Sequence, residues 1–126
     1  KPDAVKAGNV DKINSMIEDA GLNIIEKKEL TLSKEEAQEF YAVHSEKPFY
    51  DELCNFMISG PIVVQKIEGE NAIEAYRKVM GSTNPEEAEE NTIRKEYATS
   101  IQENAVHGSD SEENALKELN FFFKET

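Results

Sequence analysis

The spacing of apolar residues predicts helices that alternate with strands. Apolar positions from Val10 to Ala20 keep helical spacing, and Gly21 ends that helix. Residues 82–99 are polar and irregular, and a long loop of this kind in a small domain is usually functional. In chain order we expect a helix over 10–20, a strand over 22–31, a helix over 33–44, a short helix from Pro48, a strand over 62–67, a helix over 71–80 and a final helix over 111–123.

Polar residues at the predicted helix starts support these boundaries. Ser33 and Glu36 have the spacing of a capping box. Asn71 is expected to cap the helix that follows it. Ser109, Asp110 and Ser111 each offer an N-cap before the last helix, and Asp110 with Glu113 has the capping-box spacing. Strands separated by helices favour an α/β or α+β sandwich, although periodicity alone does not say whether the sheet is parallel.

Composition limits the class of protein. The chain has 126 residues, enough for one domain over residues 1–126 with a real core. Its net charge of -12 argues against nucleic acid as a main partner. No apolar run approaches transmembrane length and no signal peptide is visible, so we expect no membrane association. The single cysteine, Cys54, cannot form an internal disulfide, which fits a cytoplasmic protein.

Arginine is used sparingly. Of the fourteen basic residues only Arg77 and Arg94 are arginine. A guanidinium can hold an oxyanion through two parallel bonds, which an ammonium cannot do. Composition alone favours two ordinary surface residues, whereas the resemblance described below implies phosphate contacts for both.

Several catalytic classes are excluded by missing motifs. The chain has no P-loop, no dinucleotide-binding glycine motif, no cysteine–histidine cluster for zinc and no nucleophile elbow. The most informative segment is 104–111, where His107 lies among small and polar residues and Gly108 allows a ligand to approach closely. Taken alone, this segment is equally consistent with a histidine that has no role.

Seven segments together resemble the nucleoside diphosphate kinase family, over essentially the whole chain. They are Lys1-Pro2-Asp3-Ala4-Val5, Phe40-Tyr41 with His44, Lys47-Pro48-Phe49-Tyr50, Ser59-Gly60-Pro61, Met80-Gly81-Ser82-Thr83-Asn84-Pro85, Thr92-Ile93-Arg94, and Asn104 through Ser111. Their order is that of the family. Asn91 stands where the family usually has glycine, and asparagine tolerates positive φ, so we expect this turn to be kept.

The resemblance implies a fold and a reaction. The fold is a ferredoxin-like α+β sandwich with a four-stranded antiparallel sheet and helices on its faces. The family has a strand that runs into the position of Lys1, so we expect the natural protein to begin earlier. The reaction is ping-pong transfer of the γ-phosphoryl group of a nucleoside triphosphate, such as ATP, to a nucleoside diphosphate. His107 is the expected nucleophile, which suits a neutral imidazole.

The resemblance also assigns roles to further residues. Those expected around the nucleophile are Tyr41, Ser109 and Glu118, with Glu118 orienting the imidazole. Those expected to bind the nucleotide are Lys1, Arg77, Arg94 and Thr83 at the phosphates, Asn104 at the ribose, and Phe49, with Leu53 nearby, at the base. Without the resemblance, Glu118 is a solvated helix residue and Phe49 is ordinary core.

Cofactor, assembly and alternatives follow from the same resemblance. Mg²⁺ is expected to arrive with the nucleotide, held mainly by its phosphates rather than by a protein metal site. A homo-oligomer, hexamer or tetramer, is expected. One alternative is a catalytically silent family member that acts as a binding or assembly module. A second is a histidine phosphocarrier, against which Phe49 and the Thr83 loop count, because a carrier needs no base-binding site.

Overall fold

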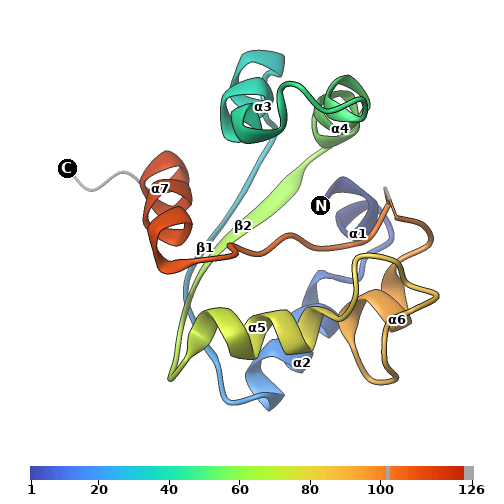
Figure 1. The fold of residues 1–126 in the computed structure, drawn as a ribbon. Coiled ribbons are helices and arrows are strands. Elements are labelled where there is room, and N and C mark those ends of the chain that lie inside the picture. Colours follow the sequence, from blue (N-terminus) through green and yellow to red (C-terminus); the bar gives the residue numbers. More distant parts are fainter. Residues whose placement is uncertain (102, 124–126) are drawn as a thin grey trace.

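The computed structural model describes residues 1–101 and 103–123. Helices surround a single pair of long strands (Figure 1). The elements are α1 (Pro2–Lys6), α2 (Val10–Asp19), β1 (Asn23–Leu30), α3 (Lys34–Phe40), the 3-10 turn η1 (Ala42–His44), α4 (Tyr50–Met57), β2 (Ile62–Glu68), α5 (Ala72–Met80), α6 (Ile93–Tyr97) and α7 (Glu112–Phe122).

The two strands pair antiparallel, from Asn23 opposite Glu68 to Leu30 opposite Ile62. An irregularity between Ile24 and Glu26 shifts the register. Helices α3 and α4 lie beyond one end of this pair, and α2 and α5 lie near the other (Figure 1). The α+β class and the ferredoxin-like arrangement are therefore confirmed, and the sheet is antiparallel.

The strand count differs from the expected four, because the described residues contain two strands. The segment 104–109 passes β2 without forming a ladder with it, and a cavity of about 230 Å³ is lined by both. Backbone groups in this segment instead bond to Lys1, Asp3 and Arg94. A strand requires regular pairing along its length, which these individual bonds do not provide.

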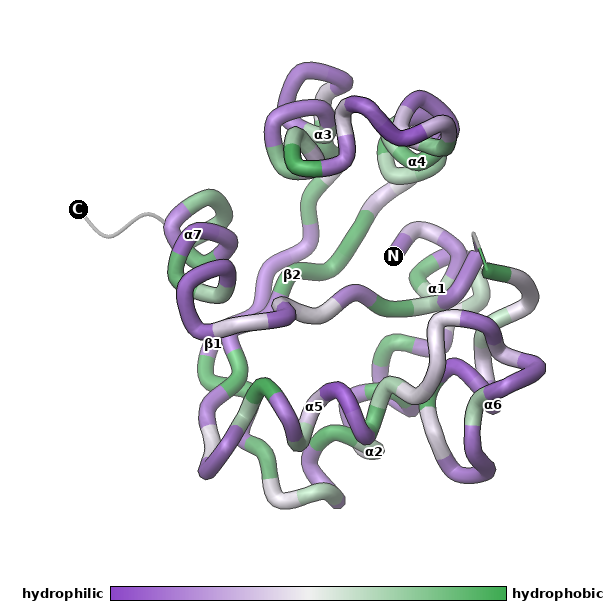
Figure 2. Tube along the Cα trace, viewed as in Figure 1, coloured by the Kyte–Doolittle hydropathy of each residue, from purple (hydrophilic) through white to green (hydrophobic). Residues whose placement is uncertain are grey.

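Apolar side chains form two separate clusters rather than one. The first cluster joins α1, α2, α5 and α6 to the segment 104–109, through Ala4, Ile13, Ile17, Leu22, Met80, Ile93, Ala105 and Val106. The second cluster joins α3 and α4 to the adjoining strand ends, through Leu32, Ala37, Tyr41, Cys54, Met57 and Ile62. Hydrophobic stretches in these elements face inward, while polar stretches such as the outer turns of α3 face solvent (Figure 2).

Most predicted boundaries are correct, and the exceptions have local causes. The Ser33–Glu36 capping box is present, and Asn91 adopts the expected positive φ of 66°. The predicted loop 82–99 contains α6, whose N-cap Thr92 accepts from the N–H of Lys95. This short helix was not predicted because the segment is mostly polar. The capping hydroxyl of Thr92 stabilises its first turn.

One predicted cap lacks its bond, and another is selected from three candidates. Asn71 occupies the N-cap position of α5 in a left-handed conformation, and its side chain makes no capping bond. Of Ser109, Asp110 and Ser111, it is Ser111 that caps α7, because its hydroxyl accepts from the N–H of Asn114. The Asp110 carboxylate accepts from the side-chain amide of Asn114 instead. Several adjacent Asp and Ser residues can each act as a cap, and only the path of the chain decides between them.

Among the described residues, no helix is both long enough and apolar enough to span a membrane.

Candidate active site

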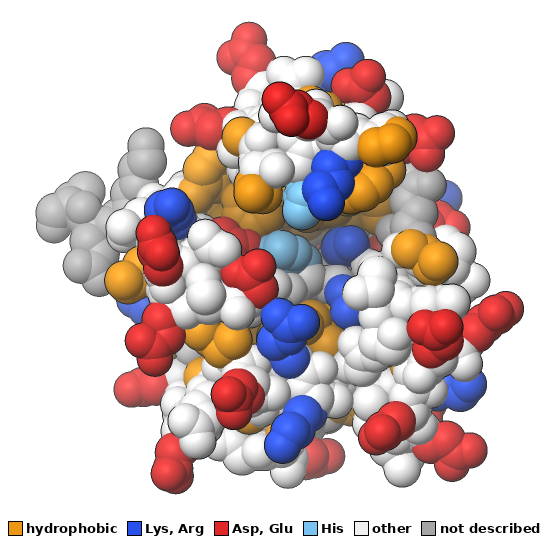
Figure 3. All heavy atoms as spheres, viewed as in Figure 1, with side chains coloured by type: hydrophobic (Ala, Val, Ile, Leu, Met, Phe, Trp, Pro, Cys, Tyr) orange, Lys and Arg blue, Asp and Glu red, His pale blue; other side chains and the backbone are white. Residues whose placement is uncertain are grey.

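A hollow on one face of the molecule contains both histidine side chains (Figure 3). Lysine and arginine side chains border this hollow, while most acidic side chains lie farther out (Figure 3). The protein has a net charge of -12, so the basic border is a local reversal of the overall sign. Such a hollow favours an anionic ligand, because nearby cations outweigh distant acids at short range.

His107 lies in this hollow and bonds to a carboxylate. Its Nε2 atom lies within hydrogen-bonding distance of Glu118 Oε1 on α7. Burial alone would raise the pKa of the Glu118 carboxyl, but hydrogen bonds from His107 and Ser109 lower it below its usual value. Glu118 therefore stays ionised and orients the imidazole, so the predicted grouping of His107, Ser109 and Glu118 is present in the structure.

Aromatic side chains contact the other sides of the His107 ring. Phe40 meets the ring edge-on with centroids 5.4 Å apart, and Tyr41 does so at 6.0 Å. Tyr41 is buried, and its hydroxyl has no hydrogen-bond partner among the described residues. Burial also raises the pKa of Tyr41, so its hydroxyl keeps its proton. Tyr41 thus packs against the imidazole of His107, beside which it was predicted to lie.

The backbone just before His107 forms a strained turn. Ala105 has a φ of 71°, although it carries a side chain, and it is fully buried. The N–H of Val106 donates to the carbonyl oxygen of Asn104 at 2.8 Å, which closes a three-residue γ-turn. A non-glycine residue in this conformation costs about 1–3 kcal/mol and persists only where its surroundings fix it.

Hydrogen bonds from distant parts of the chain hold this turn. The main-chain nitrogen of Lys1 donates to the Ala105 carbonyl at 3.0 Å. The Asp3 carboxylate accepts from the Ala105 N–H at 3.0 Å. Arg94 donates to the carbonyl of Asn104 at 3.4 Å and to that of Val106 at 2.9 Å. The segment that carries His107 is therefore held from two sides.

Arg94 is the most enclosed of the predicted phosphate-binding residues. Its side chain is buried, and a third N–H donates to the carbonyl of Gly81 at 3.2 Å. Three of its five N–H groups are thus used on backbone carbonyls. The forked contacts to phosphate stay a prediction, and the structure shows Arg94 bonded to three separate backbone carbonyls.

Lys1 and Asn104 pair at the same end of the hollow. The Lys1 ammonium donates to the Asn104 side-chain oxygen at 2.7 Å. Burial, and then the nearby charge of Arg94, lower the pKa of the Lys1 side chain to about 8, while Asp3 acts in the opposite direction. Lys1 is therefore mostly charged at neutral pH, and it loses that charge in mildly alkaline solution.

The remaining predicted nucleotide residues are exposed. Phe49 precedes α4 with 46 % of its surface exposed, and its ring lies 5.7 Å from that of His44. Arg77 on α5 is exposed, and it lies near enough to Arg94 and Asp110 to affect their pKa values. Thr83 is exposed in the loop after α5. These side chains keep surface that a ligand can cover.

Two contributors to the site were not predicted from the sequence. Asp3 belongs to the first motif but was given no role of its own, and its bond to Ala105 joins residues 102 positions apart. The strained turn at Ala105 was not foreseen, because alanine does not favour positive φ. The only available signal was the position of Asp3 directly after Lys1 within a recognised motif.

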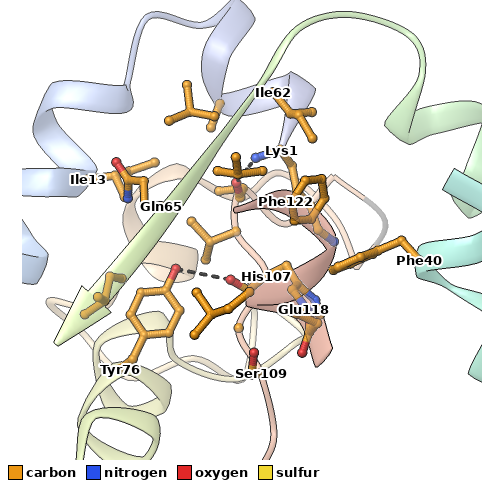
Figure 4. A pocket seen from close by; sticks show the side chains of 18 of the residues that line it. Lys1, Ile13, Phe40, Ile62, Gln65, Tyr76, His107, Ser109, Glu118 and Phe122 are labelled. Atoms are coloured by element: carbon orange, nitrogen blue, oxygen red, sulfur yellow. Dashed lines mark hydrogen bonds and ion pairs between the residues drawn. The ribbon is translucent and has the colours of Figure 1, made fainter. Parts of the chain in front are cut away.

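An apolar cavity lies beside the site and shares its wall. Its volume is about 230 Å³, and its lining includes β2, the segment 105–109 and α7. Ile13, Ile62 and Phe122 point toward its interior, whereas His107 and Ser109 lie at one side (Figure 4). Within residues 1–101 and 103–123, no three histidine, cysteine or acidic side chains are grouped as a metal site would require.

Comparison with known proteins agrees with this geometry. The model of the nucleoside diphosphate kinase family matches residues 1–126. The nucleoside diphosphate kinase of Rhodovulum sulfidophilum is 59 % identical over 123 residues, which cover 98 % of this chain and 88 % of the relative. That of Erythrobacter litoralis is 57 % identical over 125 residues, covering 99 % and 89 %.

Solved structures agree in the same way. The nucleoside diphosphate kinase of Aquifex aeolicus superimposes with a TM-score of 0.96 at 42 % identity, covering 98 % of this chain and 90 % of that one. The enzyme from Encephalitozoon cuniculi gives a TM-score of 0.96 at 34 % identity, covering 99 % and 85 %. Matches in sequence and in fold therefore extend over nearly the whole chain, and this protein belongs to the nucleoside diphosphate kinase family.

Proposed function

We propose that this protein transfers the γ-phosphoryl group of a nucleoside triphosphate to a nucleoside diphosphate through a phosphorylated His107. The observation that supports this most directly is the pairing of His107 with Glu118 on the surface of a basic hollow. Membership of the family supports the same activity. A histidine held in one orientation and open to an anion has what a phosphoryl acceptor needs.

The contact with Glu118 indicates which ring nitrogen reacts. Nε2 faces the carboxylate, and a proton on Nε2 satisfies both groups. The lone pair is then on Nδ1, which attacks the γ-phosphorus as the bond to the bridging oxygen breaks and the nucleoside diphosphate leaves. Glu118 stabilises the positive charge that develops on the ring. In the second half-reaction, a terminal oxygen of another diphosphate attacks the same phosphorus, and the bond to Nδ1 breaks.

The nucleotide-binding roles are proposed from the same arrangement. Lys1, Arg77 and Thr83 bind the phosphates, because phosphoryl transfer depends on positioning and on neutralising oxygen charge. Arg94 contributes charge at the phosphate end while it also holds the backbone beside His107. Asn104 binds the ribose side.

The base is proposed to stack on the exposed ring of Phe49, with Leu53 nearby. Stacking tolerates any base, since every base has a π-face. This tolerance is what an enzyme that exchanges phosphate among different nucleosides requires.

A divalent cation accompanies nucleotide kinases, and we propose Mg²⁺. No group of acidic or histidine side chains among the described residues would hold it alone. The donors therefore come mainly from the nucleotide phosphates, as is common for Mg²⁺. When bound, Mg²⁺ supplies neutralisation of phosphate charge. The cytoplasmic location and the hexameric or tetrameric assembly stay predictions.

Labelling with γ-labelled ATP, followed by a chase with unlabelled UDP, GDP or CDP, tests the proposal. A kinase forms an acid-labile phosphoenzyme that each diphosphate discharges. A phosphocarrier takes up label but keeps it in the presence of diphosphates, and a silent family member never takes up label. Mapping the label to His107 is required as well, and label on any other residue would contradict the assigned nucleophile.

A further inference from the structure

Tyr76 is the one tyrosine whose hydroxyl bonds to the main chain of the proposed nucleophile. It lies on α5, and its Oη atom donates to the carbonyl oxygen of His107 at 3.2 Å (Figure 4). Burial raises the pKa of Tyr76 to about 12, so the hydroxyl remains a donor throughout the neutral range. No role for Tyr76 follows from phosphate or base binding.

The ring of Tyr76 also fills the space beside Gly108. A side-chain carbon at Gly108 would lie 2.7 Å from Tyr76 Cε1 and 2.8 Å from Met80 Cε. Gly108 therefore lets α5 approach the backbone directly after the nucleophile. The hydroxyl and the ring edge of Tyr76 together contact two consecutive residues of the segment, His107 and Gly108.

Among the described residues, the other side-chain bonds to residues 104–107 go to residues 104–106 or to the ring of His107. Arg94 and Asp3 bond to the preceding residues 104–106. Glu118 bonds to the ring of His107. The orientation of an imidazole depends on its backbone as well as on its ring partner. Arg94 holds the carbonyl that precedes His107, and Tyr76 holds the one that follows it.

We infer that Tyr76 is a positioning residue for phosphoryl transfer: it fixes the His107 peptide so that Glu118 can hold Nε2 and Nδ1 faces the hollow. The inference rests on the function proposed above. Tyr76 contacts no reacting atom, so its loss should slow the chemical step and leave nucleotide binding unchanged.

The test is Tyr76→Phe, which removes the hydroxyl and keeps the ring against Gly108. Its matched control is Tyr50→Phe, because the Tyr50 hydroxyl also donates to a backbone carbonyl, that of Gln38, at 3.0 Å. We expect the single-turnover rate of phosphoenzyme formation to fall about tenfold in Tyr76→Phe and to change less than twofold in Tyr50→Phe. The Kd for ADP should stay within about twofold of the parent in both variants.

A second measurement does not depend on turnover. The ¹⁵N shifts of the His107 imidazole report which nitrogen carries the proton, and Tyr76→Phe should increase the share protonated at Nδ1. If Tyr76→Phe keeps both the rate and the ¹⁵N shifts of the parent protein, the inference is overturned. Equal losses of rate in Tyr76→Phe and Tyr50→Phe would overturn it as well. If the parent itself never takes up phosphate, the proposed function fails instead, and the ¹⁵N shifts alone then decide whether Tyr76 positions the ring.

Discussion

The two apolar clusters support the two halves of the site in different ways. The first carries the His107 segment, which is held in a strained turn by hydrogen bonds that Lys1 and Arg94 donate and Asp3 accepts. The second carries the α3–α4 region, whose Tyr41 and Phe49 reach the site mainly through ring contacts. The first half is thus fixed in advance and the second keeps exposed surface for a ligand. Loss of the contacts that hold the His107 segment should reduce the rate, and loss of side chains that face the ligand, such as Phe49 and the Lys1 ammonium, should reduce affinity.

The largest expected effect comes from removing the nucleophile. His107→Ala should abolish phosphoryl transfer while ADP with Mg²⁺ still binds, because the phosphate and base contacts come from other residues. Calorimetry with ADP measures the binding. The second histidine, His44, is the matched control, since His44→Ala should still form the phosphoenzyme. Loss of ADP binding together with activity in His107→Ala would mean that His107 is structural.

Arg94→Lys should be the next most damaging change. An ammonium cannot reach the carbonyls of Gly81, Asn104 and Val106 at once, and a bond from a charged group contributes about 1.5–3 kcal/mol. We expect kcat/KM to fall more than tenfold and Tm to fall by several degrees. Arg77→Lys is the control on an exposed arginine, where activity should fall and Tm should not. Equal Tm values for Arg94→Lys and the parent would show that the three bonds from Arg94 to backbone carbonyls do not fix the turn.

Phe49→Ala tests the second half of the site. Stacking of a base on an aromatic ring contributes about 1–3 kcal/mol, so KM should rise by about fivefold or more while kcat stays within about twofold. Steady-state kinetics with ATP and with GTP give both constants. Thermal melting serves as the control, because Phe49 is 46 % exposed and should contribute little to the core. A fall in kcat at constant KM would mean that Phe49 supports the chemical step, like the residues around His107, and does not bind the base.

The smallest expected effect is a pH dependence at Lys1. Because its pKa is lowered to about 8, the side chain is charged below that pH and becomes neutral above it. The affinity for ADP should therefore fall about fivefold between pH 7 and pH 9, through loss of a charge-assisted phosphate contact. Lys1→Met, which has no ammonium, should bind equally weakly at both values. An unchanged affinity in the parent would remove Lys1 from the phosphate site.

Much of the secondary structure could be predicted because it depends on neighbours in the chain. The apolar spacing of 10–20 and the Ser33–Glu36 capping box each involve residues a few positions apart. The errors occurred where several local solutions have similar free energies. Ser111 and Asp110 are both good caps, and the choice between them was made by the path of the chain into α7.

The site was predicted through residue types and their order. Seven collinear motifs were enough to identify the family. One of them contains His107, and the resemblance placed Glu118 beside it, as the structure does. The acceptors of Arg94 were not predictable, because a guanidinium binds carbonyl and phosphate oxygens by the same geometry.

The sequence by itself determined the family and most helix boundaries, and it predicted His107 as the nucleophile. Only the tertiary structure decided how the His107 segment is held: the strained turn at Ala105, the bond that Asp3 accepts from that turn and the bond from Tyr76 to His107. The reason is the separation of the partners. Asp3 and Ala105 are 102 positions apart, and Tyr76 and His107 are 31 apart. No local pattern encodes such contacts, because they form only when packing of the first cluster brings α1 and α5 against the same short segment.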